Sequence, residues 1–392
     1  MTPTTGTTPV VRAQPKIVIV GAGIVGASIA YNLSLRDADV TVVDASTPGM
    51  AASRAAYAWI NAHPKPPRSY HDLNRRSMDV WSRWERHLGG DVGITWGGEL
   101  RWTTTGDGAS EMRDEVSLMQ SWGYPVNLIT PDQLAEMEPG LVTDPITAAT
   151  YAPTEGHVDT AAVIARALTL VRERGAELLT GTAVKGLTVE TQNGVGKVTG
   201  VETEEAHVPA DIVVLAAGYS TRELAADVGL DFPQIESPGA TLFTPPMPPI
   251  FKTVACVHTP RDLPDPQMNF RQMPDGRVQV HGGTHFGSVG DNSVEDAEWM
   301  LAELEKFVPA IAGASVDEWR RAMRPMPGDG LPIIGYPDSD GSHNGPSNVY
   351  FSVMHSGVSL SALVGEVATL EILDNARVDF LEDFRYDRFL GV

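Results

Sequence analysis

The chain has 392 residues, of which 42% are hydrophobic, so it can build two domains or one elaborated α/β domain. No stretch is apolar for long enough to span a bilayer, and the formal net charge of −21 opposes binding to nucleic-acid phosphates. The single cysteine, Cys256, excludes an internal disulfide. Residues 1–15 are polar and lack the apolar core of a signal peptide, so we expect a disordered leader on a cytoplasmic protein that binds neither membranes nor nucleic acids.

The first predicted elements form a βαβ unit over residues 16–44. A β-branched strand at 17–20 leads into a glycine-rich turn and an apolar-periodic helix, and a second strand follows at 40–43. The next stretch, 46–63, is rich in small residues, which suits a chain that passes close to a bound ligand. A further helix is predicted at 70–87.

Three glycines of the turn follow the G-x-G-x-x-G spacing of dinucleotide-binding loops. Gly21 permits a tight turn, Gly23 leaves room for a pyrophosphate at the helix N-terminus, and Gly26 lets the helix pack closely on the strand. Asp44 ends the second strand, where a carboxylate accepts hydrogen bonds from a ribose 2′-OH and repels a 2′-phosphate. The sequence therefore favours FAD or NAD over NADP.

Residues 97–145 look like material inserted into this fold, with a strand within 97–105 and an amphipathic helix at 110–122. The chain then returns to a Rossmann-like sheet. Residues 160–184 predict a helix followed by a strand, and 210–220 predict a buried parallel strand that ends in a turn of small residues.

From residue 233 to about 313 the pattern becomes antiparallel. The short β-rich runs PGATLFTP, FKTVACVHT, QMNFRQMP and RVQVHGGT are separated by Pro, Asp and Gly. Asp275 and Gly276 make a plausible hairpin turn between the last two runs. A second, sheet-based domain therefore interrupts the first, and the chain ends on a strand that feeds a helix within 348–373.

Several segments spread over nearly the whole chain carry a family resemblance. They are GAGIVGASIAYNLSLRDADVTVVD, YAPTEGHVDTAAV, ADIVVLAAGYS, DGRVQVHGGT, RPMPGDGLPIIG and MHSGVSLSALVGE. Together they resemble the glycine oxidase, sarcosine oxidase and D-amino-acid oxidase family of FAD-dependent amine oxidoreductases. A nicotinamide enzyme would need the first segment but not the last four, so the resemblance favours FAD.

The resemblance implies an α/β fold. A Rossmann-like FAD-binding domain is built from separated segments, and an antiparallel-sheet substrate domain is inserted into it. We expect the FAD-binding domain at 16–96, 146–232 and 314–392, and the substrate domain at 97–145 and 233–313.

The family pattern also assigns cofactor contacts. Gly21, Gly23 and Gly26 would hold the pyrophosphate and Asp44 the adenosine ribose, while Val184 would contact adenine through its backbone. Other residues are expected to contact FAD beside its isoalloxazine ring or its adenosine half. They are Ala45, Ala52, Ser53, Arg54, Ala217, Gly218, Arg324, Gly357, Val358 and Ser359. For Ala217 and Gly218 a simple strand-end turn is the alternative. The helix that begins near Gly357 would stabilise the negative charge of reduced flavin through its backbone amides.

Arg324 matches the arginine with which glycine oxidases and their relatives bind the substrate carboxylate. A planar guanidinium fork can pair both carboxylate oxygens at once. The resemblance makes Asn269, His281 and Arg271 further pocket candidates, and His355 a candidate contact of the substrate. Asn269, His281 and His355 are therefore predicted with Arg324 as catalytic-site residues. A turn histidine such as His355 is equally typical of a solvated loop.

Three departures from the family pattern concern substrate and cofactor. Asn269 stands where glycine oxidases place a tyrosine, and Ser359 stands where sarcosine oxidases place a carboxylate-binding lysine, so the substrate stays open. Met326 and Pro327 occupy the region where sarcosine oxidases tether flavin through cysteine, which predicts FAD bound without a covalent link. The strand at 277–281 lacks the lysine that sarcosine oxidases use toward oxygen, so O2 and another electron acceptor both stay possible.

The resemblance implies an enzyme that oxidises the C–N bond of a small amine or amino acid. A hydride would pass from the carbon beside a neutral amine to flavin N5, and the resulting imine would hydrolyse. Two alternatives stay open at this point. One is a 2-hydroxy-acid oxidoreductase on the same scaffold, and the other is a flavin-binding subunit of a dehydrogenase complex that has no catalytic activity of its own.

Overall fold

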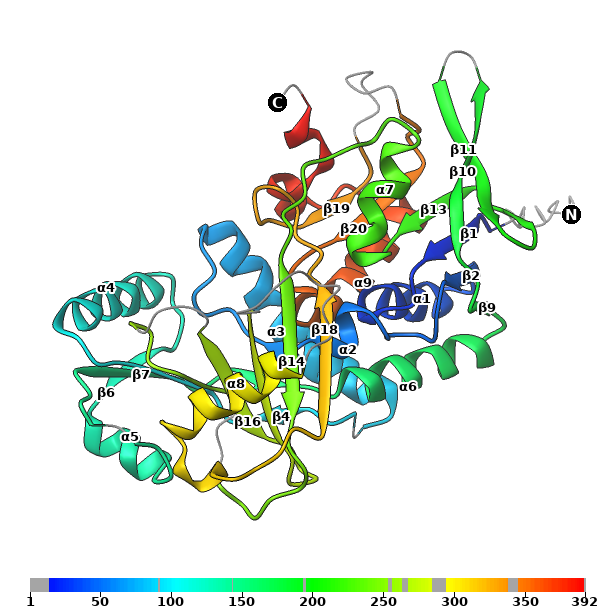
Figure 1. Cartoon of the computed structure of the whole chain (residues 1–392). Helices are drawn as coiled ribbons and strands as arrows, with labels where there is room; N and C mark the ends of the chain where they lie inside the picture. The colour runs from blue at the N-terminus through cyan, green and yellow to red at the C-terminus, as the bar shows by residue number, and fades with distance from the viewer. Residues whose placement is uncertain are drawn as a thin grey trace, which may run out of the picture.

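The computed structural model describes residues 14–90, 92–142, 144–192, 195–252, 256–262, 267–283, 294–337 and 345–390. Residues 1–13 of the predicted leader lie outside the described residues. The described chain forms two units, each built on its own large sheet (Figure 1).

The sheet of the first unit is mostly parallel. Its strands are β1 (Lys16–Val20), β2 (Asp39–Asp44), β9 (Glu177–Thr180), β13 (Ile212–Leu215), β19 (Ile333–Gly335) and β20 (Val349–Val353). They lie in the order β19-β20-β13-β1-β2-β9, and only β19 among them pairs in the antiparallel sense. The strand before the glycine turn, β1, lies between β13 and β2, so β-branched residues are buried on both of its faces.

Helices cover one face of this sheet. They are α1 (Ile24–Ser34), α3 (Arg68–Leu88), α6 (Thr160–Glu173) and α9 (Gly357–Asp374). Their apolar side chains form one core with residues of the sheet. The other face packs against α7 (Thr221–Ala226) and a small sheet of β10 (Val184–Gln192), β11 (Val195–Thr203) and β12 (His207–Pro209). The β10–β11 hairpin projects from the body of the molecule (Figure 1).

The sheet of the second unit has eight strands. They are β18 (Glu318–Met323), β14 (Pro238–Phe243), β17 (Val278–Gly283), β16 (Met268–Gln272), β15 (Cys256–His258), β5 (Glu99–Thr103), β7 (Ala148–Ala152) and β6 (Asn127–Ile129), in that order across the sheet. It carries α4 (Gly106–Ser121), α5 (Pro131–Met137) and α8 (Glu295–Glu305). The hairpin predicted at Asp275 and Gly276 joins β16 to β17, and Gly276 has the positive φ of +88° that such a turn requires.

This sheet extends beyond the ranges predicted for the substrate domain. Strand β7 lies within 146–232 and β18 lies within 314–392, both of which were predicted for the FAD-binding domain. Strand β7 pairs with β5, and β18 pairs with β14 along its full length. The pairing partners are distant in sequence, so the local pattern could not assign these strands to the second sheet.

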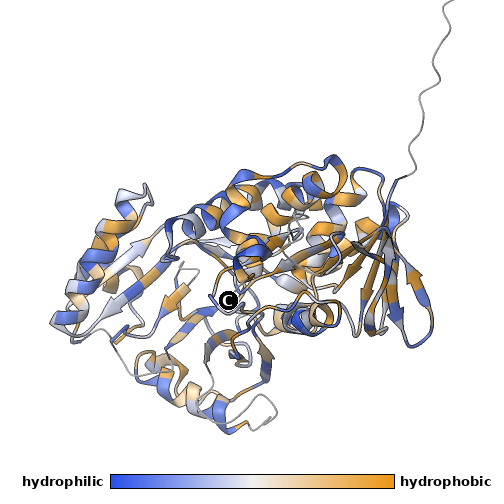
Figure 2. Ribbon diagram, turned by 90° about the horizontal axis from the view of Figure 1, so that it is seen from above, coloured by the Kyte–Doolittle hydropathy of each residue, from blue (hydrophilic) through white to orange (hydrophobic). Residues whose placement is uncertain are grey.

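Short elements lie between the two units. They are α2 (Ala52–Ala55), β3 (Trp59–Ile60), β4 (Thr95–Trp96) and β8 (Gly156–His157), of which the three strands form one small sheet. Hydrophobic and hydrophilic residues alternate along the helices, as expected where one helix face packs on a core (Figure 2). Among the described helices, none is both long and apolar enough to cross a membrane.

Candidate active site

The glycine turn leaves no room for side chains. A Cβ on Gly21, whose φ is +105°, would lie 2.4 Å from the carbonyl oxygen of Ala216, and a Cβ on Gly26 would lie 1.9 Å from the carbonyl oxygen of Gly21. Gly23 caps the N-terminus of α1, and a Cβ there would point at Ser53 Oγ, 3.2 Å away. The bare backbone at this helix N-terminus fits a pyrophosphate.

Asp44 lies against the same turn. Its carboxylate accepts a hydrogen bond from the backbone N–H of Ala22 at 2.7 Å and another from the backbone N–H of Ser46 at 2.8 Å. Ser53 Oγ accepts a hydrogen bond from the backbone N–H of Ile24 at 3.1 Å. A carboxylate can accept more bonds than these two, so Asp44 is held beside the turn with lone pairs left for a ribose.

The predicted adenosine contacts lie at the ends of other strands. Val184 begins β10, and its side chain packs against the core beneath the six-stranded sheet. Ala217 follows β13, and its Cα would lie 2.9 Å from a Cβ on Gly21, so it borders the glycine turn. Gly218 begins a short helical turn with a φ of +61°. The contact of these residues with adenosine stays a prediction, and so does that of Ala45.

A cavity of about 800 Å³ lies between the two units. Its lining combines predicted residues with others that the sequence analysis did not select. The predicted ones are Ala52, Asn269, His281, Arg324, His355, Val358 and Ser359. The others include Tyr57, Trp59, His63, Lys65, Tyr70 and Arg101. Segments that are far apart in sequence thus meet in one site of the size that small-molecule sites usually have.

Two predicted arginines lie outside this cavity. Arg54 pairs with Glu318, and together with Arg271 it lines a separate cavity of about 320 Å³. The Arg271 guanidinium lies 4.4 Å from the ring centre of Tyr57, a residue that lines the main cavity. Arg271 therefore lines the smaller cavity and not the main one, and a role for it at the substrate stays a prediction. Ser53 and Gly357 are likewise absent from the lining of the main cavity.

Arg324 reaches the cavity from the loop after β18. Its guanidinium donates to the carbonyl oxygen of Gly282 at 3.2 Å and to Ser237 Oγ at 3.5 Å. A Cβ on Gly239 would lie 2.6 Å from Arg324 Nε, so this glycine of β14 leaves the space that the guanidinium occupies. No described carboxylate forms an ion pair with Arg324, and its charge is available to an anionic ligand.

Two histidines line the cavity beside Arg324. Thr241 Oγ1 donates its only hydrogen to the carbonyl oxygen of Ala55, 2.6 Å away. Its contact with Nδ1 of His281, at 2.7 Å, must therefore be one in which Nδ1–H donates and Thr241 Oγ1 accepts. This bond fixes the tautomer and leaves Nε2 of His281 as a hydrogen-bond acceptor. Burial and the charge of Arg324 lower the pKa of His281 to about 3. The His355 side chain is exposed, but it is surrounded by protein atoms. This desolvation together with Arg324 and Lys65 lowers the pKa of His355 to about 4, so both rings are neutral at pH 7.

Ser359 and Asn269 also line the cavity, in different ways. Asn269 is the register partner of His281 on the neighbouring strand, so their side chains lie side by side. The Ser359 side chain is only 1% exposed, and its hydroxyl accepts from the backbone N–H of Asn61 at 3.0 Å. Trp59 O lies 2.9 Å from the same hydroxyl, so Ser359 ties the start of α9 to the segment after β3.

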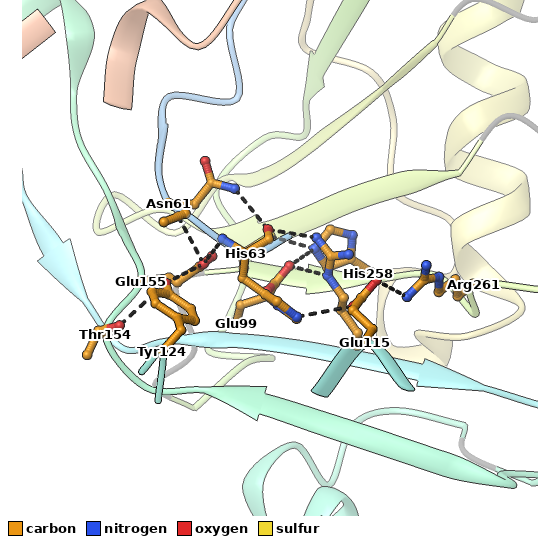
Figure 3. Close-up of polar contacts among 12 residues, drawn as sticks. Asn61, His63, Glu99, Glu115, Tyr124, Thr154, Glu155, His258 and Arg261 are labelled. Atoms are coloured by element: carbon orange, nitrogen blue, oxygen red, sulfur yellow. Dashed lines mark hydrogen bonds and ion pairs between the residues drawn. The ribbon is translucent and has the colours of Figure 1, made fainter. Parts of the chain in front are cut away.

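A buried ionic network forms one wall of the cavity (Figure 3). Glu99 lies at its centre, with one carboxylate oxygen 2.7 Å from Nδ1 of His63. The other oxygen lies 2.5 Å from Nε of Arg101 and 2.7 Å from Nε2 of His258. Nε2 of His63 lies 3.1 Å from a carboxylate oxygen of Glu115. Glu99 is 1% exposed, and Arg101 and His63 compensate its charge.

Glu155 extends this network from the side of Tyr124. It accepts from the hydroxyl of Tyr124 at 2.8 Å and from the backbone N–H of His63 at 2.9 Å. Burial and the charge of Glu99 raise the pKa of Glu155 to about 8. Burial lowers the pKa of His63, but Glu99 and Glu115 outweigh it and raise the value to about 9. At neutral pH the network therefore holds a protonated His63 and a largely protonated Glu155.

We expect the free energy of unfolding to fall as pH rises from about 6.5 to about 9. The folded pKa of His63 lies above its ordinary value of about 6.5, so its contribution is complete below that pH and is lost as pH rises through about 9. The raised pKa of Glu155 acts in the same direction, because the unfolded chain ionises first. The pKa of Lys65, lowered to about 7 by burial, acts in the opposite direction above pH 7 and makes the fall smaller. Urea unfolding followed by tryptophan fluorescence at both ends of this range measures the change. Greater stability at the alkaline end would contradict the charge assignment.

The sequence analysis missed Lys65, His63 and the network. The sequence offered only a modest signal for these residues. His63 ends the small-residue stretch 46–63, which was predicted to pass close to a ligand, and Lys65 lies two residues beyond it. Glu99 and Arg101 are charged residues on a predicted strand, where both lie on one face. Their partners come from other segments, which the sequence pattern does not identify.

Comparisons with known proteins agree with this geometry. The family model described as FAD dependent oxidoreductase matches residues 16–370. A glycine oxidase of Geobacillus kaustophilus (strain HTA426) is 25% identical, with 96% of this chain and 97% of that protein covered. A subunit of the opine oxidase of Rhizobium meliloti is 26% identical, with 95% of this chain and 96% of that protein covered.

Solved structures confirm the predicted fold class. The crystal structure of glycine oxidase from Geobacillus kaustophilus has a TM-score of 0.81 at 23% identity, with 96% of this chain and 100% of that chain covered. The crystal structure of L-proline dehydrogenase from P. horikoshii has a TM-score of 0.81 at 21% identity, with 96% and 98% covered. Since the family model spans most of the sequence, from the glycine turn into α9, the chain belongs to the family of FAD-dependent oxidoreductases.

Proposed function

We propose that this enzyme oxidises the C–N bond of an amino acid or an N-substituted amino acid. The observation that carries the proposal is Arg324, a guanidinium without a described carboxylate partner in the wall of the main cavity. Such a group binds the carboxylate of an amino acid through two parallel hydrogen bonds. Relatives whose names include glycine oxidase and opine oxidase support the choice of an amine donor over a 2-hydroxy acid.

Bound FAD supplies the hydride acceptor, N5 of its isoalloxazine ring. The chain holds the donor: Arg324 binds the carboxylate, and the Nε2 lone pair of His281 accepts a hydrogen bond from the donor amine. The amine must be neutral before its neighbouring carbon can lose a hydride, and two neutral histidines suit that state. Loss of the hydride and of one proton leaves an imine, which takes up water and splits into a carbonyl compound and an amine.

A screen of donors under anaerobic conditions tests the proposal. Amino acids, N-alkyl amino acids, simple amines and 2-hydroxy acids are mixed with the holoenzyme, and bleaching of the flavin absorbance is followed. We expect bleaching by compounds with both an amine and a free carboxylate. Bleaching by 2-hydroxy acids alone would favour a 2-hydroxy-acid oxidoreductase. No bleaching by any class of donor would favour a flavin-binding subunit without catalytic activity of its own. The electron acceptor and the cytoplasmic location stay predictions.

We expect acid or heat to release intact FAD from the purified yellow protein. Cys256 is fully buried in β15, with its Sγ 3.4 Å from Nε2 of His258, so it is not presented to the main cavity. Met326 and Pro327 cannot form a thioether to flavin. Absorbance of the supernatant and of the precipitated protein measures the released fraction. Flavin that stays on the denatured chain would contradict a non-covalent link.

We expect Asp44→Ala to weaken FAD binding by about 1–3 kcal/mol, because charge-assisted hydrogen bonds to the ribose are lost. Equilibrium binding of FAD to the apoprotein measures the effect. The matched control is Asp39→Ala, which removes an exposed carboxylate at the other end of the same strand, β2. If both variants bind FAD as the original protein does, Asp44 acts only within the turn.

A further inference from the structure

Lys65 places a second basic group in the wall of the main cavity. Its Nζ donates to Asn74 Oδ1 at 2.9 Å and to Ser356 Oγ at 3.0 Å, and Ser359 Oγ lies 3.5 Å away. These partners are all neutral oxygens. They hold the ammonium at the start of α9 and satisfy its hydrogen bonds, but they do not compensate its charge.

Some basic groups elsewhere in the interior have carboxylate partners, whereas the buried Arg271 lies against the ring of Tyr57 and has none among the described residues. Arg101, in the same cavity wall, pairs with Glu99 at 2.5 Å. Arg385 pairs with Glu371 at 2.6 Å behind α9. Of the described basic groups that line the main cavity, Lys65 and Arg324 have no carboxylate within ion-pair distance. Burial lowers the pKa of Lys65 to about 7, although Glu155 and Glu99 act to raise it, so an anion bound at hydrogen-bond distance would stabilise the ammonium form.

The two cations belong to different walls of the cavity. Lys65 comes from the segment after β3 and is held at the start of α9, whereas Arg324 comes from the loop after β18 and is held by Gly282 of β17. His355 lies near enough to both for each positive charge to lower the pKa of its ring. Lys65, Arg324 and His355 all line the main cavity, so a donor bound there has access to both cations.

We propose that the substrate is an amino acid with a second acid group, whose first carboxylate binds Arg324 and whose second carboxylate binds Lys65. The class includes dicarboxylic amino acids and amino acids with a carboxyalkyl group on nitrogen. This inference rests on the proposed function for the role of the first carboxylate.

The cavity has the capacity for such a donor. A volume of about 800 Å³ is large for a site that would hold only a flavin ring and the smallest amino acid. The wall near Lys65 is polar, with Asn74, Ser356 and Tyr70 around the ammonium. An apolar side chain would leave the half-buried Lys65 without an ion-pair partner, so the same wall selects against hydrophobic amino acids.

Binding of acids that cannot be oxidised tests this inference without turnover. Calorimetric titration of the holoenzyme compares malonate, succinate, glutarate and adipate with the monoamide of each, which has the same length and one acid group fewer. We expect at least one diacid to bind about tenfold or more tightly than its monoamide. Equal affinities within every pair would overturn the inference.

Variants assign the effect to Lys65. Lys65→Met keeps the length of the side chain without its charge, and we expect it to lower the affinity for the preferred diacid to that for the monoamide. The monoamide affinity should change less than about threefold. Lys65→Arg should keep the preference for the diacid. The control is Lys185→Met, which removes an exposed lysine of β10 that pairs with Glu204.

Three outcomes count against the inference. Equal losses for diacid and monoamide in Lys65→Met would make Lys65 a structural residue, provided that FAD content and circular dichroism are unchanged. A change of flavin midpoint potential with an unchanged diacid preference would assign Lys65 to the cofactor. A preference that persists in Lys65→Met would place the second acid elsewhere.

Turnover separates this inference from the proposed function. Glutamate is compared with glutamine and aspartate with asparagine, in both enantiomers, by anaerobic flavin bleaching. If no amino acid bleaches the flavin but diacids still bind through Lys65, the proposed function fails and the diacid site stands. If amides bleach the flavin as fast as acids, the proposed function stands and the second acid is refuted.

Discussion

Replacing Arg324 by alanine is expected to raise the KM for the donor, or to slow anaerobic flavin reduction, at least about tenfold. A charged hydrogen bond contributes about 1.5–3 kcal/mol, and each ~1.4 kcal/mol is a factor of ten. Arg324→Lys should be impaired as well, because lysine keeps the charge but cannot form two parallel bonds to one carboxylate. The measurement is the concentration dependence of flavin reduction by the best donor, in the original enzyme and in both variants.

The surroundings of Arg324 make this test specific. The guanidinium has no described ion-pair partner, so its removal leaves no buried carboxylate without a counter-charge, and the fold should persist. Arg222→Ala is the control, since Arg222 is exposed and pairs with Asp231 away from the cavity lining. If Arg324→Ala reduces its flavin with normal rate and affinity, or if methyl esters of donors react as well as free acids, Arg324 does not bind the substrate carboxylate.

Features that depend on a short stretch of sequence could be predicted. The glycine turn is one example, because the strand, the turn and the helix are contiguous and each glycine has a local steric reason. Helix α3, observed at Arg68–Leu88 and predicted at 70–87, is another, since its apolar face is visible as a periodic pattern. The hairpin between β16 and β17 follows from one Asp-Gly pair.

Features that depend on distant segments could not be predicted from the residues alone. Asn269 and Arg271 are two residues apart on β16 and share one face of the strand, so the sequence pattern does not distinguish them. In the folded chain Asn269 lines the main cavity, whereas Arg271 lies against Tyr57, from another segment, and lines the smaller cavity. The assignment of β7 and β18 to the second sheet likewise depends on pairing with strands that are remote in sequence.

The position of Lys65 shows the same limit. The resemblance identifies Ser359 as a position that lacks the lysine found there in sarcosine oxidases. In the folded chain, Nζ of Lys65 lies 3.5 Å from Ser359 Oγ, so a lysine from the segment after β3 reaches the position next to that serine. Transferring a family pattern residue by residue shows that Ser359 lacks a lysine. It does not identify Lys65 as the lysine beside that position, because Lys65 comes from another part of the sequence.

Glu99→Gln is expected to lower the free energy of unfolding by roughly 3–5 kcal/mol, the range found when one partner of a buried ion pair is removed. The substitution keeps the shape of the side chain but leaves Arg101 and the protonated His63 without the carboxylate that lies 2.5 Å from one and 2.7 Å from the other. The negative charge of Glu99 also raises the pKa of His63, so we expect His63 in the variant to lose its proton at lower pH.

Urea unfolding followed by circular dichroism and tryptophan fluorescence measures this loss of stability. Glu202→Gln is the matched control, because Glu202 also pairs with a histidine, His207, but on the exposed β11–β12 edge, where water screens the pair and little stability should be lost. The two variants remove the same charge and differ in burial. A loss below about 1 kcal/mol in Glu99→Gln would mean that water compensates the cations of this wall, and that Glu99 does not hold them in place.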